Sequence, residues 1–171
     1  MFLKPSYIFT DITQLTVEQL REIGVEGLIF DLDNTLLPPH APHLQDYVAD
    51  WLKGIAEAGF PYVIVSNNHD KNYLKQAEHL LNVPVLGPAK KPSRKSIFKA
   101  LEWLKLPSEK VAVIGDRPLT DLWGGQRAGC KTILVDPLMR ADENGIKHLL
   151  RTLERLPVCR PKGGRDRLLA L

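Results

Sequence analysis

This 171-residue chain is poor in cysteine and has no long apolar run. Cys130 and Cys159 belong to no CxxC pair or cysteine–histidine cluster, so a structural zinc site is disfavoured. Two isolated cysteines also fit a reducing compartment, and we expect a cytoplasmic protein. No apolar run approaches the roughly 18 to 20 residues that a membrane span needs. The N-terminal residues 1–5 lack the basic region and long apolar core of a secretory signal.

What the chain does contain predicts one globular domain over residues 1–171, because 44% apolar and 25% charged residues are ordinary globular values. The net charge of +3 is unevenly spread, since residues 147–171 hold seven basic and two acidic side chains. We expect residues 158–171 to form a solvated, flexible tail. Attraction of this basic tail to anionic lipid is the alternative, and binding to nucleic acid is disfavoured.

Apolar strand-like segments alternate with helical patterns along the chain, which predicts an α/β fold with a doubly wound parallel sheet of five main strands. The expected strands are 27–32, 61–66, 83–86, 111–116 and 131–135. The expected helices are 16–23, 43–58, 70–81, 93–105, 121–128 and 144–156. Ligands of such sheets bind beyond the carboxyl ends of the strands, so those ends are where a site is expected.

Three details of the helices also follow from the sequence. Thr16 and Gln19 have the spacing of a capping box. Ser93 is expected to cap the helix over 93–105, with Phe98 among its inward-facing residues. Trp51 and Trp103 are expected in the core.

Two carboxylates follow the first expected strand, in the segment Gly27–Leu36 (GLIFDLDNTL). Alternation along an extended backbone places Asp31 and Asp33 on the same side. Two like charges so close need a cation or a shared proton, which suggests a metal site or an acid/base pair. The same residues also suit a solvated turn, because Asp-Asn sequences favour turns.

Polar residues follow two further strands. Ser66, Asn67 and Asn68 end the second, and Gly115-Asp116 ends the fourth, with Asp121 shortly after. A basic loop containing Lys90 and Lys91 precedes the helix over 93–105. Carboxylates with a hydroxyl and a lysine predict a phosphate site assisted by Mg²⁺, a cation that prefers oxygen ligands.

The order of these motifs resembles the haloacid dehalogenase (HAD) superfamily of phosphohydrolases. The matching motifs are DxDxT (31–35), Ser66, Lys91-Pro92 and GDxxxxD (115–121). The resemblance implies a Rossmann-like core in which Asp31 is the nucleophile that forms an aspartyl-phosphate. It implies that Asp33 protonates the leaving group and then activates water, while Thr35 supports the turn that presents both.

The resemblance also implies how phosphate and metal are bound. Ser66 and the Asn67 amide would hold phosphoryl oxygens, and Lys91 rather than Lys90 would offset their charge. Asp116 would bind Mg²⁺ together with Asp31 and the Asp33 carbonyl. Asp121 would bind the metal through water or orient Lys91, and a simple helix-capping role is the alternative.

An acid at position 33 favours phosphate esters, because dehalogenases of the superfamily lack it and its ATPases carry threonine there. Many members have a cap domain that closes over a small substrate. About 30 residues separate Thr35 from Ser66 and about 24 separate Ser66 from Lys91, which leaves no room for one. An uncapped site suits a phosphate on a large molecule or one enclosed by a partner.

Among uncapped members, the chain is similar to the subclass IIIA group of YqeG-type proteins, which includes phosphatidylglycerophosphate phosphatases. The motifs that carry this similarity are FTDI (9–12), DLDNTL (31–36), VSNN (65–68), AKKP (89–92) and GDRPLTD (115–121). The similarity implies hydrolysis of a phospholipid head-group phosphate to give phosphatidylglycerol.

Two other functions remain open at this point: a soluble phosphatase of a sugar or nucleotide phosphate, and a non-catalytic binding protein. The apolar residues 2–9 could dock peripherally on an anionic membrane or pack on the sheet.

Overall fold

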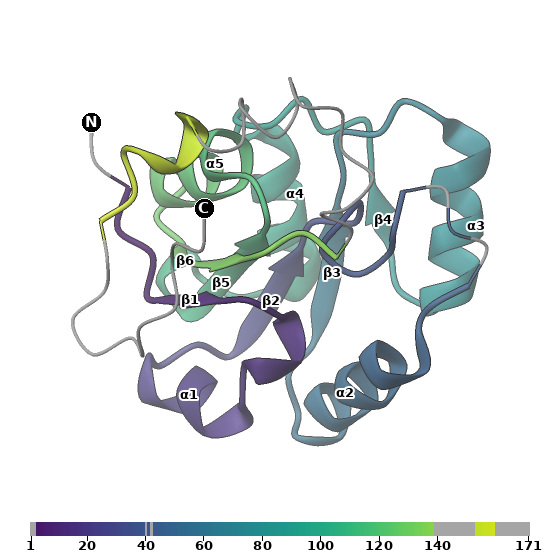
Figure 1. Cartoon of the computed structure of the whole chain (residues 1–171), viewed down its shortest axis with the longest axis horizontal. Coiled ribbons are helices and arrows are strands. Elements are labelled where there is room, and N and C mark those ends of the chain that lie inside the picture. The colour runs from purple at the N-terminus through teal and green to yellow at the C-terminus, as the bar shows by residue number, and fades with distance from the viewer. Residues whose placement is uncertain (1–2, 40, 42, 139–152, 160–171) are drawn as a thin grey trace.

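A six-stranded parallel sheet forms the centre of this computed structural model, which describes residues 3–39, 41, 43–138 and 153–159 (Figure 1). The strand order is β1-β6-β5-β2-β3-β4, so the chain moves outward from β2 to β4 and then returns to β5 on the other side. The strands are β1 (Tyr7–Phe9), β2 (Gly27–Phe30), β3 (Tyr62–Val65), β4 (Val85–Leu86), β5 (Val111–Gly115) and β6 (Lys131–Val135). The predicted doubly wound parallel sheet is confirmed.

Helices connect these strands across both faces of the sheet (Figure 1). The α-helices are α1 (Val17–Glu22), α2 (Asp46–Glu57), α3 (Lys71–Leu81), α4 (Lys95–Leu104) and α5 (Trp123–Arg127). Short 3₁₀ turns are η1 (Ile12–Gln14) and η2 (Ser108–Lys110), and η3 (Pro118–Leu122) is a π-helical turn. The predicted helix over 121–128 is therefore η3 followed by α5.

Alternation along the strands divides the core into two layers. Leu28 and Phe30 of β2 point to the face covered by η1, α1, α2 and α3. Ile29, between them, points to the opposite face and packs in the layer of α4. Each central strand is thus buried on both sides, as a doubly wound sheet requires.

The N-terminal residues contribute a strand that the sequence did not predict. Tyr7–Phe9 pairs in parallel with Ile133–Val135 at the edge of the sheet, and the Leu3 side chain is fully buried. Of the two expectations for residues 2–9, packing on the sheet is therefore the one that the described residues follow.

Two expectations for α4 are wrong. The helix begins at Lys95 with Arg94 as its N-cap, so Ser93 does not cap it. Phe98 and Trp103 are 43% and 48% exposed, because the buried stripe of α4 lies between them. That stripe consists of Ile97, Ala100, Leu101 and Leu104.

Other local predictions are confirmed. Thr16 and Gln19 form the reciprocal capping box at the start of α1. Trp51 packs against the core and donates a hydrogen bond to the Leu15 carbonyl oxygen over 2.8 Å. Most of the predicted helix over 144–156 and the tail from residue 160 lie outside the described residues. Among the helices that are described, none has the length and apolar character to span a membrane.

At Gly125, α5 approaches the sheet closely. A Cβ there would lie 2.9 Å from Thr132 Cγ2 and from Val113 Cβ. We expect Gly125→Ala to lower the free energy of unfolding by about 1–3 kcal/mol through overpacking. Gly54→Ala on exposed α2 is the control, since nothing lies within 4 Å of its added Cβ, and helix propensity favours alanine there by roughly 0.5–1 kcal/mol. Equal urea midpoints for the two variants would contradict the close approach.

Candidate active site

The carboxyl ends of three neighbouring strands bring the predicted polar residues together. β2 lies between β5 and β3, and all three run parallel. Asp31, Ser66 and Asp116 each follow one of these strands directly. The Asp31 amide donates a 2.9 Å hydrogen bond to the Ile114 carbonyl oxygen, so strand pairing with β5 fixes the backbone of Asp31. These strand ends lie at the point where the chain direction across the sheet reverses, as expected for a site in this type of fold.

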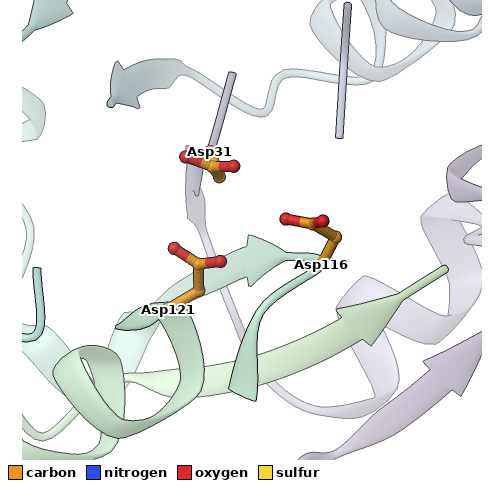
Figure 2. A group of neighbouring side chains, drawn as sticks. All are labelled: Asp31, Asp116 and Asp121. Atoms are coloured by element: carbon orange, nitrogen blue, oxygen red, sulfur yellow. The ribbon is translucent and has the colours of Figure 1, made fainter. Parts of the chain in front are cut away.

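Three carboxyl groups converge at these strand ends. Figure 2 shows Asp31 from the end of β2, Asp116 from the end of β5 and Asp121 from the turn that follows, directed into a common space. One carboxylate oxygen from each lies within 4.8 Å of the others. Asp116 and Asp121 are almost fully buried, and Asp31 is partly exposed.

Lys91 neutralises part of this negative charge. Its Nζ atom lies 2.6 Å from Asp31 Oδ1 and 2.6 Å from Asp121 Oδ1, and its side chain is 2% exposed. Lys90, the competing candidate, is exposed. Lys91 rather than Lys90 is thus the lysine that contacts two of the three carboxylates, Asp31 and Asp121.

The electrostatics of the group favour a bound cation. Burial raises the pKa of Asp31 to about 8; Lys91 counteracts this shift, whereas Asp121 and Asp116 add to it. Burial disfavours the charged form of Lys91, but the carboxylates of Asp121 and Asp31 outweigh it and raise the lysine pKa. When all three carboxyl groups are ionised and Lys91 is protonated, two negative charges remain, which a divalent cation would balance. An all-oxygen set of this kind fits Mg²⁺.

Asp33 stands apart from the three-carboxylate group. Its Oδ1 accepts a 2.9 Å hydrogen bond from the Tyr73 hydroxyl, and its Oδ2 accepts a 3.2 Å hydrogen bond from Asn68 Nδ2. Asp31 and Asp33 therefore have different partners although they are two residues apart. Asp31 faces a lysine and two acids, whereas Asp33 faces neutral hydrogen-bond donors.

The predicted phosphate-binding residues have distinct surroundings. Ser66 is buried at the end of β3, where its Oγ accepts a 3.0 Å hydrogen bond from the Asn68 amide. The Asn67 side chain accepts from the Lys91 backbone amide over 2.6 Å and donates to the Lys91 carbonyl oxygen over 3.1 Å. Asn67 thereby fixes the loop that carries Lys91. Thr35 is 1% exposed in the turn after β2, a position that suits support of the turn.

Sequence reasoning missed the contacts of Tyr73 and Asn68 with Asp33. Asn68 was noted only as part of the Asn pair after β3, and Tyr73 only as part of the helix over 70–81. The signal for Tyr73 is its place in the first turn of α3, since a helix that follows a parallel strand starts at the edge where ligands bind.

The C-terminal described segment, residues 153–159, is tied to the loop that carries Asp116 and Asp121. Arg117, next to Asp116, pairs with the buried Glu154 at 2.5 Å and donates its backbone amide to Asp121 Oδ2 over 3.1 Å. Hydrogen bonds between Leu3 and residues 157 and 159 hold the segment against the N-terminus. The loop after β5 is therefore braced from outside the sheet.

Comparison with known proteins agrees with this site. A family model described as mitochondrial PGP phosphatase matches residues 1–139. The chain belongs to this family. It is a phosphatase of the HAD type, and a probable phosphatase, YqeG of Bacillus subtilis, is 37% identical over 82% of this chain and 81% of its own length.

The names of two further relatives of the phosphatase state a substrate. Phosphatidylglycerophosphate phosphatase 1 of Arabidopsis thaliana is 29% identical, and its Chlamydomonas reinhardtii counterpart is 31% identical. The matches cover 90% and 91% of this chain but only 46% and 61% of the relatives. The phosphatase thus spans roughly half of the plant relative's length.

Solved structures support the fold. An uncharacterized protein from Listeria monocytogenes serotype 4b matches with a TM-score of 0.54 and 19% identity, over 80% of this chain and 90% of that chain. A 4-nitrophenylphosphatase from Thermotoga maritima matches with a TM-score of 0.52 and 15% identity, over 73% of this chain and 90% of that chain. At such identities these structures are evidence for the fold alone.

Gly115 provides the space in which Asp121 approaches β5. A Cβ at residue 115 would lie 2.4 Å from Asp121 Cγ and from its Oδ2. We therefore expect Gly115→Ala to displace this carboxylate and to weaken Mg²⁺ binding roughly 10- to 100-fold, as loss of a group supporting a metal site does. Isothermal titration with Mg²⁺ measures the effect, with Gly54→Ala as the control. Unchanged Mg²⁺ affinity would show that the position of Asp121 does not matter for the metal.

Proposed function

We propose that this phosphatase is a Mg²⁺-dependent phosphomonoester hydrolase that removes the terminal phosphate of phosphatidylglycerophosphate through an aspartyl-phosphate. The observation that carries the proposal is the asymmetry of the two acids after β2. Asp31 lies against Lys91 at 2.6 Å, whereas Asp33 is held separately by Tyr73 and Asn68. One carboxylate is arranged to attack while the other is arranged to exchange a proton.

In the first half of the reaction, one oxygen of Asp31 attacks the phosphorus and the bond from phosphorus to the alcohol oxygen breaks. Asp33 gives its proton to that oxygen, so phosphatidylglycerol leaves with a neutral hydroxyl group in place of an alkoxide. Lys91 occupies Asp31 Oδ1, which fixes the orientation of the carboxylate. Ser66 and the Asn67 amide, at the end of β3, are the proposed contacts for phosphoryl oxygens.

In the second half, Asp33 takes a proton from a water molecule that attacks the phosphorus of the aspartyl-phosphate. The bond from phosphorus to Asp31 breaks, and inorganic phosphate leaves. Mg²⁺ at Asp31, Asp116 and Asp121, with the Asp33 carbonyl, would supply the charge neutralisation that phosphoryl transfer needs. Thr35 supports the turn that presents both acids.

The lipid substrate is supported by the family and by the span of the match to the plant and algal relatives. The described residues between Thr35 and Ser66 form one turn and α2, with no added domain over the strand ends. Such a site can accept a phosphate that projects from a membrane. We therefore propose that the phosphatase acts from the cytoplasmic side as a peripheral enzyme on anionic bilayers.

The nucleophile is tested by Asp31→Asn, which replaces the attacking carboxylate with an amide of the same shape. We expect the rate of phosphate release to fall at least about 10³-fold, as for the loss of other nucleophiles. Beryllium fluoride should inhibit the wild type by occupying Asp31, and the bound complex should be absent in the variant. Asp50→Asn, on an exposed position of α2, is the control and should retain wild-type rates. Residual turnover near that of the control would contradict the assignment of Asp31.

The substrate is tested by a phosphate-release panel with and without Mg²⁺. Phosphatidylglycerophosphate in anionic vesicles is compared with glycerol 3-phosphate, sugar phosphates and nucleoside monophosphates. We expect turnover of the lipid to depend on Mg²⁺ and to exceed that of the soluble esters. Fast turnover of one soluble ester with no activity on the lipid would instead identify a soluble metabolite phosphatase.

A further inference from the structure

The hydrogen bonds around Asp33 come from a single stretch of chain, the loop after β3 and the first turn of α3. Among the described residues, Tyr73 and Asn68 donate to the Asp33 carboxyl, one to each oxygen. Asn68 and Tyr73 lie 35 and 40 residues after Asp33 in the sequence. The carboxyl is therefore held at both oxygens by groups outside its own turn.

Both donors are fixed in place. Asn68 Oδ1 accepts a 2.9 Å hydrogen bond from the Asp70 amide, which leaves its Nδ2 facing Asp33. Asp70 in turn caps α3 by accepting from the backbone amides of Asn72 and Tyr73. The Tyr73 ring is 7% exposed and packs in the core layer shared with α2. Packing and capping thus determine where the Tyr73 hydroxyl lies.

We propose that Tyr73 is a positioning residue for the acid/base step, which holds Asp33 in the orientation for proton transfer to and from the phosphate ester. This inference rests on the proposed function. A phenol hydroxyl can donate and accept, so it remains a partner of Asp33 before and after the proton has moved. Asn68 supports the same orientation from the other oxygen.

A positioning role matters in this chain because the described residues after β2 and β3 include no cap domain. In members with a cap domain, closure over the substrate can complete the arrangement of the reacting groups. Here the described residues after β2 and β3 lead directly into α2 and α3. A rigid contact from the sheet-packed α3 supplies the orientation without any such movement.

The test uses the full-length protein and two esters that differ in their need for a proton. The alcohol of phosphatidylglycerophosphate must be protonated as it leaves, whereas 4-nitrophenolate is stable as an anion. We compare kcat/KM because it reports formation of the aspartyl-phosphate and excludes the later hydrolysis. For Tyr73→Phe we expect roughly a 10- to 100-fold fall with the lipid and less than about a threefold fall with 4-nitrophenyl phosphate. The loss with the lipid should appear in kcat rather than KM.

Tyr62→Phe is the matched control. Tyr62 begins β3 at the opposite end from Ser66, and its ring packs against Phe30 with centroids 5.6 Å apart. Removing its hydroxyl should leave both kcat/KM values unchanged. Asn68→Ala is the second variant, and it should lower the ratio of lipid to aryl ester turnover in the same direction as Tyr73→Phe. Circular dichroism establishes that each variant is folded.

Equal losses on the two esters for Tyr73→Phe, or no loss on either, would overturn the positioning role while leaving the proposed function intact. If Tyr73→Phe does not fold, the ratio for Asn68→Ala decides in the same way. A wild-type protein that hydrolyses neither ester would overturn the proposed function, and the positioning role with it.

Discussion

The ion pairs of Lys91 are the interaction on which the rest of the site depends. Its ammonium lies between Asp31 and Asp121 at 2.6 Å from each, and buried carboxylates as close as these repel one another without a compensating charge. Strand pairing brings Asp31 and Asp116 to adjacent strand ends, but pairing alone does not make their charges compatible. Asn67, which follows β3, fixes the Lys91 backbone with two hydrogen bonds. It thereby holds the ammonium that compensates the carboxylates after β2 and β5.

Much of the fold follows from the sequence, because central strands of a parallel sheet are short continuous apolar runs that end abruptly in polar residues. The run before Asp31 and the run before Asp116 both have this character. Tyr7–Phe9 was missed since an edge strand of three residues is half-buried and leaves no such pattern. Phe98 and Trp103 were misplaced because apolar spacing marks one side of a helix without defining how wide the buried stripe is.

The residues of the candidate site at the strand ends could also be predicted from the sequence, whereas those inside helices could not. Acids, hydroxyls and lysines at strand ends are visible in sequence because the end of each strand is visible. Tyr73 lies inside a helix, where one aromatic residue among apolar neighbours indicates core packing. Its hydroxyl can contact Asp33 only when the fold brings the loop after β2 against α3, because the two residues are 40 positions apart in sequence.

The pairing of β1 with β6 bears on how the protein is made. β1 can pair only after residues 131–135 have been synthesised, and Leu3 meets its neighbours at residues 157–159 later still. Until then one edge of β6 has no partner, and the brace between Arg117 and Glu154 is missing. Contacts of such sequence separation form late and slowly. The pairing of β1 with β6 therefore joins residues 126 positions apart, whereas the pairing of β2 with β5, which aligns Asp31 and Asp116, joins residues 84 positions apart and has the lower loop-closure cost.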